Sequence, residues 1–77
     1  QVQDEQMMFR VIRAAFNQRR KTLVNALSSQ LGNITKEEAE RAIVNCGFDT
    51  RIRGEVLDIG GFAKISDEIV KIMRVDL

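Results

Sequence analysis

A cluster of positive charge without neighbouring acids is the feature of this sequence best suited to binding a ligand. Between Arg10 and Lys21 the chain carries five cations and no Asp or Glu. The 77 residues include 12 basic and 11 acidic side chains, which give a net charge of +1, so the rest of the chain sums to −4. Local charge decides association with polyanions better than the total does. The sequence therefore predicts a partner of high negative charge.

The segment Phe16–Thr22 holds three consecutive cations together with neutral hydrogen-bonding side chains. Guanidinium groups pair bidentately with phosphate oxygens, and amides and hydroxyls suit phosphate and sugar oxygens. The plain alternative is a solvated helix start whose cations pair with Glu side chains elsewhere. Cations at a helix start oppose the helix dipole, however, and such an unfavourable placement favours function. We expect phosphate contacts from Arg10, Arg13, Arg19, Arg20 and Lys21, and sugar or phosphate contacts from Asn17, Gln18 and Thr22.

Groups for catalysis or metal binding are scarce. The chain has no His and one Cys, which excludes a His-based triad, a His-based metal site and an internal disulfide. No glycine-rich phosphate loop follows a strand, and Gly60-Gly61 is too short to form one. Cys46 lies in an apolar helical row and is interpreted as a small core residue. The chain by itself is therefore predicted to hold no catalytic site, no cofactor and no metal.

Two further patterns have simpler explanations. A glycine-containing turn between two helices could belong to a helix-turn-helix motif, with Lys36–Cys46 as the recognition helix. That segment has three Glu against two cations, so DNA phosphates would repel it. In the segment Arg51–Glu55, Glu55 can pair with Arg53 or Arg51 and tie down an irregular loop.

The elements that must position these side chains are helical, because good helix formers dominate and β-branched alternation is scarce. We predict an all-α fold, a small orthogonal bundle of four main helices with an irregular segment before the last helix. The predicted helices are Asp4–Phe16 with Asp4 as N-cap, Arg20–Gln30, Lys36–Cys46, and a last helix that begins at the cap Asp58 and reaches Met73.

Several local signals fix these helix ends. Thr35-Lys36-Glu37-Glu38 fits a capping box preceded by Ile34, which can pack on Ala39. Gly32 and Gly47 fit helix C-termini, and Gly60 and Gly61 weaken the first turn of the last helix. The side chains expected to turn inward are Leu23, Ala26, Leu27, Leu31, Ala39, Ala42, Ile43, Cys46, Phe48, Ile52, Val56, Leu57, Phe62, Ala63, Ile65, Ile69, Ile72 and Met73.

The first helix is apolar around more than half of its circumference, whereas a surface helix usually has one apolar face. Either it is a central helix surrounded by its three neighbours, or one of its sides packs on a partner. The alternative function is therefore a protein-interaction domain, a homodimer included, that docks through the first helix. The surface expected to dock is formed by Met7, Met8, Phe9 and Val11.

The length predicts one small domain with a single core. No apolar run approaches the roughly 18 residues of a membrane span, and no charged-then-apolar leader opens the chain. A lone thiol suits a reducing compartment. We expect a cytoplasmic protein without a membrane partner.

The run Ala14–Leu23 resembles the C-terminal domain of the 16S ribosomal RNA adenine dimethyltransferase family, which shows a nearly identical Ala-Phe-Asn-Gln-Arg-Arg-Lys-Thr sequence. The family usually has Pro at the position of Thr50 and often has acids at those of Gly60 and Gly61. Neither departure touches the basic run. The resemblance continues through Asn25-Ala26-Leu27, Gly47-Phe48-Asp49, Arg53-x-Glu55 and Leu57–Ile65, and so covers nearly the whole chain.

The resemblance implies a parent enzyme of two domains. An N-terminal Rossmann-like domain would bind S-adenosylmethionine and methylate two adjacent adenosines of small-subunit ribosomal RNA. A small helical C-terminal domain would help to dock the enzyme on the assembling subunit. This chain resembles only the second part, since the glycine-rich cofactor loop and the Asn-Leu-Pro-Tyr-type motif are absent. The implied partners are small-subunit ribosomal RNA and the missing catalytic domain.

Overall fold

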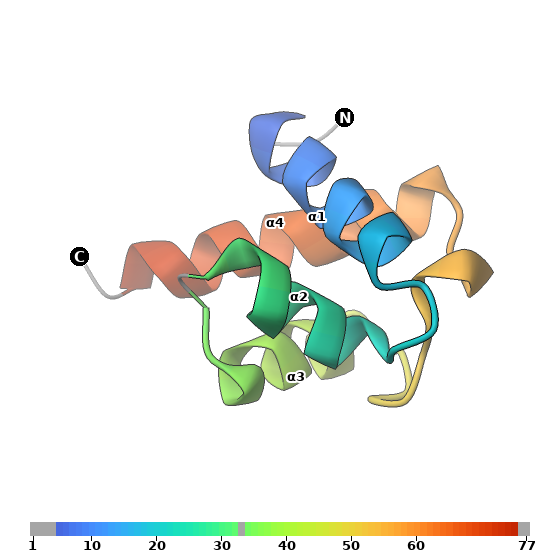
Figure 1. Ribbon diagram of the computed structural model, residues 1–77. Helices are drawn as coiled ribbons and strands as arrows, with labels where there is room; N and C mark the ends of the chain where they lie inside the picture. Colours follow the sequence, from blue (N-terminus) through green and yellow to red (C-terminus); the bar gives the residue numbers. More distant parts are fainter. Residues whose placement is uncertain (1–4, 33, 76–77) are drawn as a thin grey trace.

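The computed structural model describes residues 5–32 and 34–75, which form four α-helices and one short 3-10 helix (Figure 1). The elements in chain order are α1 (Glu5–Asn17), α2 (Leu23–Leu31), α3 (Lys36–Asn45), η1 (Gly54–Val56) and α4 (Ile59–Val75). These ranges contain no strand, and the predicted all-α fold with an irregular segment before the last helix is confirmed.

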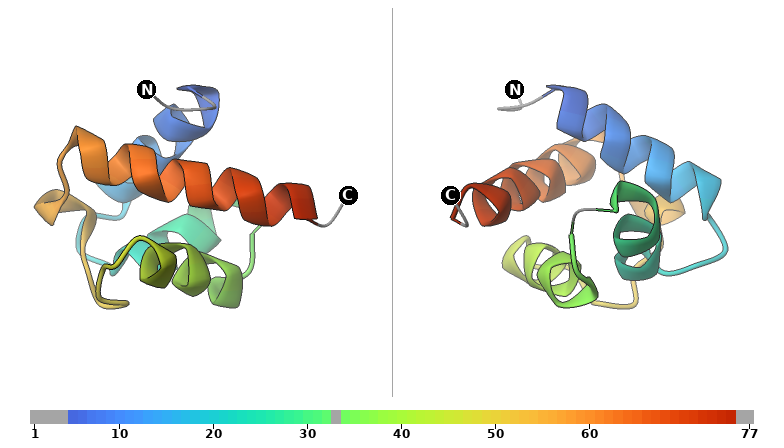
Figure 2. Two further views of the ribbon diagram at one scale, coloured as in Figure 1. Left: turned by 180° about the vertical axis from the view of Figure 1, so that it is seen from behind. Right: turned by 60° about the vertical axis from the view of Figure 1, so that its left-hand side comes forward.

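The helices pack in a closed circuit around the core. α1 packs on α2 and α4, and α3 packs on the same two helices from the other side, as both views of Figure 2 show. η1 packs on α1. The first helix therefore has two helical neighbours and a short turn rather than three surrounding helices, and part of its surface stays open.

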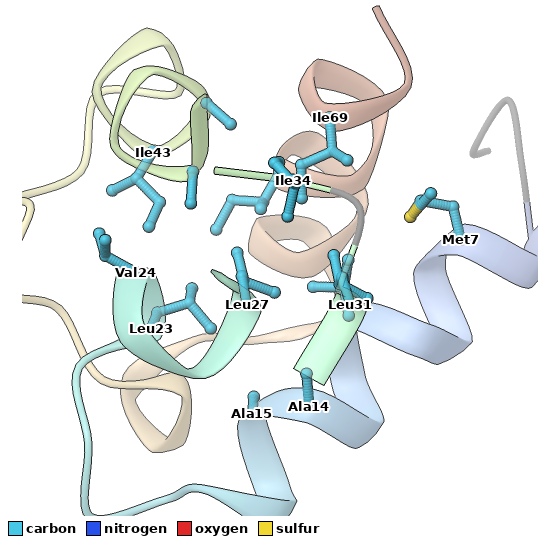
Figure 3. Close-up of a cluster of buried hydrophobic side chains, with 14 of the residues drawn as sticks. Met7, Ala14, Ala15, Leu23, Val24, Leu27, Leu31, Ile34, Ile43 and Ile69 are labelled. Atoms are coloured by element: carbon cyan, nitrogen blue, oxygen red, sulfur yellow. The ribbon is translucent and has the colours of Figure 1, made fainter. Parts of the chain in front are cut away.

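The core is built from the apolar rows that the helical period predicts (Figure 3). Leu23, Leu27, Ile43, Ile65 and Ile69 are fully excluded from solvent. Cys46, which follows α3 directly, is only half-buried. Met7 and Val11 of the first helix belong to this core, at 6% and 0% exposure, so neither is available to a partner.

The predicted helix caps of α3 are confirmed. The Glu38 N–H donates to Thr35 Oγ1 at 3.1 Å, and the Thr35 N–H donates to Glu38 Oε1 at 2.9 Å, which is a capping box. Gly32 and Gly47 have φ angles of 75° and 86°. Only glycine adopts such left-handed angles without strain, so both residues end their helices as expected.

The cap of the last helix is also confirmed. The Gly61 N–H donates to Asp58 Oδ1 at 2.8 Å. A Cβ at Gly61 would lie 2.8 Å from Leu57 Cδ2, so the glycine allows this helix start to pack closely. The predicted N-cap of the first helix, Asp4, lies outside the described residues.

The irregular segment differs from the prediction at one side chain. Phe48, Ile52 and Leu57 pack on the core, but Val56 is 71% exposed. The cause is Gly54, where a Cβ would lie 2.5 Å from the Cβ of Ala15. Because η1 presents its glycine to α1 at such close range, the turn directs Val56 to solvent.

Candidate nucleic-acid interface

The three consecutive cations lie in the turn between α1 and α2, which we call the basic turn (residues 18–22). The Gln18 N–H donates to the Ala14 carbonyl at 3.2 Å, and the Lys21 N–H donates to the Gln18 carbonyl at 2.9 Å. Thr22 is the N-cap of α2, and its hydroxyl oxygen accepts from the Asn25 N–H at 3.4 Å. The predicted start of this helix at Arg20 is therefore wrong. Threonine satisfies a free backbone amide at a helix start, whereas arginine cannot, so the helix begins after Thr22.

The cations of the basic turn have no carboxylate partner among the described residues. Arg19, Arg20 and Lys21 are exposed, as are Arg10, Arg13 and Asn17 of α1, while Gln18 and Thr22 are half-buried. The ion pairs within residues 5–32 and 34–75 include Arg51 with Asp49 and Lys71 with Glu68. None of the five cations between Arg10 and Lys21 takes part in either pair. Their charge is therefore directed to solvent.

Arg10 and Thr22 also have structural roles within the domain. The Arg10 guanidinium donates to the carbonyl of Leu31 at 3.3 Å and so ties α1 to the C-terminus of α2. A cation is favourable there because the helix dipole is negative at that end. Thr22 uses its hydroxyl oxygen to cap the other end of α2. The side chains of Arg13, Arg19, Arg20 and Lys21, in contrast, make no ion pair with the described residues.

A second loop lies directly beside the basic turn. The Leu23 N–H donates to the Ile52 carbonyl at 2.7 Å, which joins the backbone of residues 49–53 to the start of α2. This contact brings Arg51 and Arg53, both exposed, next to the basic turn. We call residues 18–22 and 49–53 together the basic edge. With Glu55 included, this end of the molecule has five cations and two acids, a net charge of +3.

The pairing in the second loop differs from the sequence prediction. Glu55 was expected to pair with Arg53 or Arg51, but Arg51 Nε lies 3.5 Å from Asp49 Oδ1. The same oxygen accepts the Arg51 N–H at 2.7 Å. This backbone donor, followed by the Arg51 side chain, lowers the pKa of the Asp49 carboxyl. Glu55 lies instead on η1 and makes no ion pair within the described part of the chain.

Arg53 is the candidate site residue that sequence reasoning missed. Its side chain is exposed and has no ion-pair partner among the described residues. Its position depends on the Leu23–Ile52 hydrogen bond and on the contact between Gly54 and Ala15, which join segments far apart in sequence. The glycine after Arg53 was the available signal, since glycine in an irregular segment often marks a close backbone approach.

Other candidate chemistry is not supported by the geometry. Burial, and then the Glu68 carboxylate, raise the pKa of the Cys46 thiol, so this group is protonated near neutral pH and is a poor nucleophile. Within the described ranges no three His, Cys, Asp or Glu side chains come together to hold a metal. No helix in these ranges is both long and apolar enough to span a membrane.

The described residues form a small all-helical domain that carries exposed cations along the basic edge. No family model matches the chain. It is 47% identical over 76 residues to the ribosomal RNA small subunit methyltransferase A of Geobacillus thermodenitrificans, and 48% identical over 71 residues to that of Clostridium acetobutylicum. It is 54% identical over 66 residues to that of Moorella thermoacetica.

These matches cover 96%, 92% and 86% of the chain but 26%, 25% and 22% of the relatives. The chain therefore spans about a quarter of the length of the curated relatives. It belongs to the ribosomal RNA small subunit methyltransferase A family and corresponds to a C-terminal part of it. The resemblance expected from the basic run is thereby confirmed.

Proposed function

We propose that this chain is the RNA-docking domain of a cytoplasmic, S-adenosylmethionine-dependent enzyme that dimethylates adenosines of 16S ribosomal RNA during small-subunit biogenesis. The observation that carries the proposal is the set of exposed cations on the basic turn, which have no carboxylate partner among the described residues. The names of the relatives support ribosomal RNA of the small subunit as the polyanion.

The basic edge suits the phosphate backbone of an RNA helix better than its bases. Two arginines and a lysine in one turn can pair with neighbouring phosphates, and each contact releases condensed counterions. Tyr and Trp are absent from the sequence, which disfavours recognition of single-stranded bases by stacking. With three to five phosphates neutralised, log K should fall with log salt at a slope of about −2 to −4.

The domain would act by tethering the enzyme to its substrate. A patch of this size binds RNA alone only in the micromolar to sub-millimolar range and with little sequence preference. In the parent enzyme even weak docking raises the local concentration of the methylating domain at its target.

S-adenosylmethionine does not fit the residues present in this chain. The described residues form no strand followed by a glycine-rich loop. Gly60 and Gly61 lie in the first turn of α4, where the Asp58 carboxylate already accepts the Gly61 N–H. Cofactor binding and methyl transfer therefore belong to the rest of the parent protein.

The test compares two triple variants with equal loss of charge. The first is Arg19→Ala, Arg20→Ala, Lys21→Ala, and the matched control is Lys36→Ala, Arg41→Ala, Lys64→Ala, which removes exposed cations from α3 and α4. Binding of each to 16S ribosomal RNA is measured between 50 and 200 mM salt. We expect the first variant to lose at least about tenfold in affinity at ~0.1 M salt and about 2 to 3 in salt slope.

The affinity and the salt slope of the control variant should stay much closer to those of the unmodified chain. Equal affinity of the first variant and the unmodified chain would contradict RNA docking through the basic turn. Equal losses in both triple variants would show that net charge alone, rather than this edge, binds the RNA.

A further inference from the structure

An apolar groove runs between the first half of α1 and the start of α4. Its lining side chains come from Met8, Phe9 and Ile12 on one side and from Ile59 and Ala63 on the other, with Gly60 between them. Phe9 and Ile59 are 73% and 75% exposed. Large apolar side chains held together at such exposure mark a binding surface.

The floor of the groove is continuous with the core. Met8 and Ile12 are half-buried and pack against the core cluster, in which the neighbouring Met7 and Val11 are fully included. A segment seated in the groove would therefore add a layer to the existing core. The open side of α1 noted above is this groove.

The size of the groove points to an occupant that is covalently attached. Seven residues line it, whereas a stable complex between free proteins uses about 20–30 residues on each side. A tethered segment meets its site at an effective concentration in the millimolar range. A small apolar surface is then sufficient, which disfavours a second copy of this chain as the occupant.

The comparisons and the chain path indicate where such a segment comes from. The relatives are about four times as long as the part that this chain spans, and the chain corresponds to a C-terminal part. Glu5, the first described residue of α1, itself lines the groove. The N-terminal end of α1 therefore lies beside the groove.

We propose that this groove receives an apolar segment of the methylating domain of the same polypeptide and so fixes the orientation of that domain relative to the basic edge. This inference rests on the proposed function, because it assumes the two-domain parent enzyme. The docking surface differs from the one predicted from the sequence, which was Met7, Met8, Phe9 and Val11. In the structure Met8, Phe9 and Ile12 line the groove together with residues of α4, while Met7 and Val11 are buried.

The experiment uses the full-length parent protein and the 77-residue chain. Amide hydrogen exchange of residues 5–12 is compared between the two, and again in the double variant Phe9→Ser, Ile59→Ser. The matched control is Val44→Ser, Val56→Ser, since these valines are 55% and 71% exposed but do not line the groove. We expect exchange at least about tenfold slower in the parent than in the chain, because docking buries Phe9 and Ile59.

The double groove variant should abolish this protection in the parent, and the control should retain it. Equal exchange in the parent and the isolated chain would overturn the proposal. So would a concentration-dependent dimer of the chain that the groove variant dissociates, since the occupant would then be a second copy.

Binding of 16S ribosomal RNA to the isolated groove variant separates the two proposals. The groove variant should bind RNA as the unmodified chain does, because the basic turn is intact. If the parent protein shows no slowed exchange at residues 5–12 while the chain still binds RNA, only the groove proposal fails. If the groove is protected in the parent protein but the basic turn does not bind RNA, only the RNA proposal fails.

Discussion

Two loops meet at one end of this domain, and they differ in whether their cations pair with a carboxylate. In residues 49–53 the carboxylate of Asp49 accepts the backbone N–H of Arg51 and also pairs with its side chain. In residues 18–22 the Gln18 carbonyl accepts the Lys21 N–H and the Thr22 hydroxyl caps α2, while Arg19, Arg20 and Lys21 have no carboxylate partner among the described residues.

The difference shows how a small domain can separate folding from binding. A loop that uses an acidic side chain to fix its backbone has a weaker positive electrostatic potential, because the carboxylate neutralises a neighbouring cation. The basic turn avoids this loss, since the Gln18 carbonyl and the Thr22 hydroxyl supply its internal hydrogen bonds. Neutral groups thus hold the turn while the charge remains available for an anionic partner.

The largest effect is expected where the second loop is anchored to α1. Gly54→Ala places a Cβ 2.5 Å from the Cβ of Ala15, which cannot move without its helix. The substitution should lower the free energy of unfolding by about 1–3 kcal/mol, as overpacking does, and displace Arg53. Urea unfolding measures the loss. Gly60→Ala is the control, because a Cβ there meets only Asp58 Oδ1 at 3.5 Å, and it should raise stability by about 0.5–1 kcal/mol. Equal effects would show that η1 is not pinned to α1.

Arg53 and Arg51 test whether an internal partner lowers the contribution of a cation to RNA binding. Arg53→Ala removes a cation that has no ion-pair partner among the described residues. It should weaken RNA binding about fivefold to tenfold at ~0.1 M salt, with a salt slope smaller by about 1. Arg51→Ala removes a cation already paired with Asp49 and should have a smaller effect on both quantities. Titrations of 16S ribosomal RNA at several salt concentrations measure the two. If Arg51→Ala weakened RNA binding more than Arg53→Ala, pairing with Asp49 would not lower the contribution of a cation to RNA binding.

Thr22 tests whether a site residue acts through structure. Thr22→Ala removes the cap of α2 and should cost about 1 kcal/mol of unfolding free energy, while the salt slope of RNA binding stays unchanged. Thr35→Ala breaks both hydrogen bonds of the capping box and should cost at least as much. Thermal unfolding and RNA titration are run on both variants. A salt slope lowered only by Thr22→Ala would show that this cap positions the cations of the basic turn for their phosphate contacts.

Asp49 gives the smallest expected effect. Asp49→Asn should free Arg51 and raise RNA affinity about two- to threefold, with Glu37→Gln on α3 as the control of equal charge change. Because the Arg51 amide lowers the pKa of the Asp49 carboxyl, the stabilisation from this contact is present above the usual aspartate range. It is lost only as the pH falls through the lowered value. Acidification should therefore mimic Asp49→Asn only below that range, and an equal gain in Glu37→Gln would assign the effect to net charge.

The sequence by itself determined the features that depend on neighbours in the chain. The capping box at Thr35 and Glu38, the glycine helix ends and the buried rows follow from hydrogen bonds and side-chain periods within a few residues. The uncompensated charge of the basic turn was visible for the same reason, because no acid stands between Arg10 and Lys21. The start of α2 was misplaced because the cations were counted as helical and Thr22 was not considered as a cap.

Only the tertiary structure decided which distant segments meet. The exposure of Val56 and the position of Arg53 depend on how η1 and the second loop pack on α1 and α2. The groove likewise exists only where α1 passes the start of α4. Such contacts join residues separated by about half of the chain, and they are selected by the packing of the whole core rather than by local conformational preference.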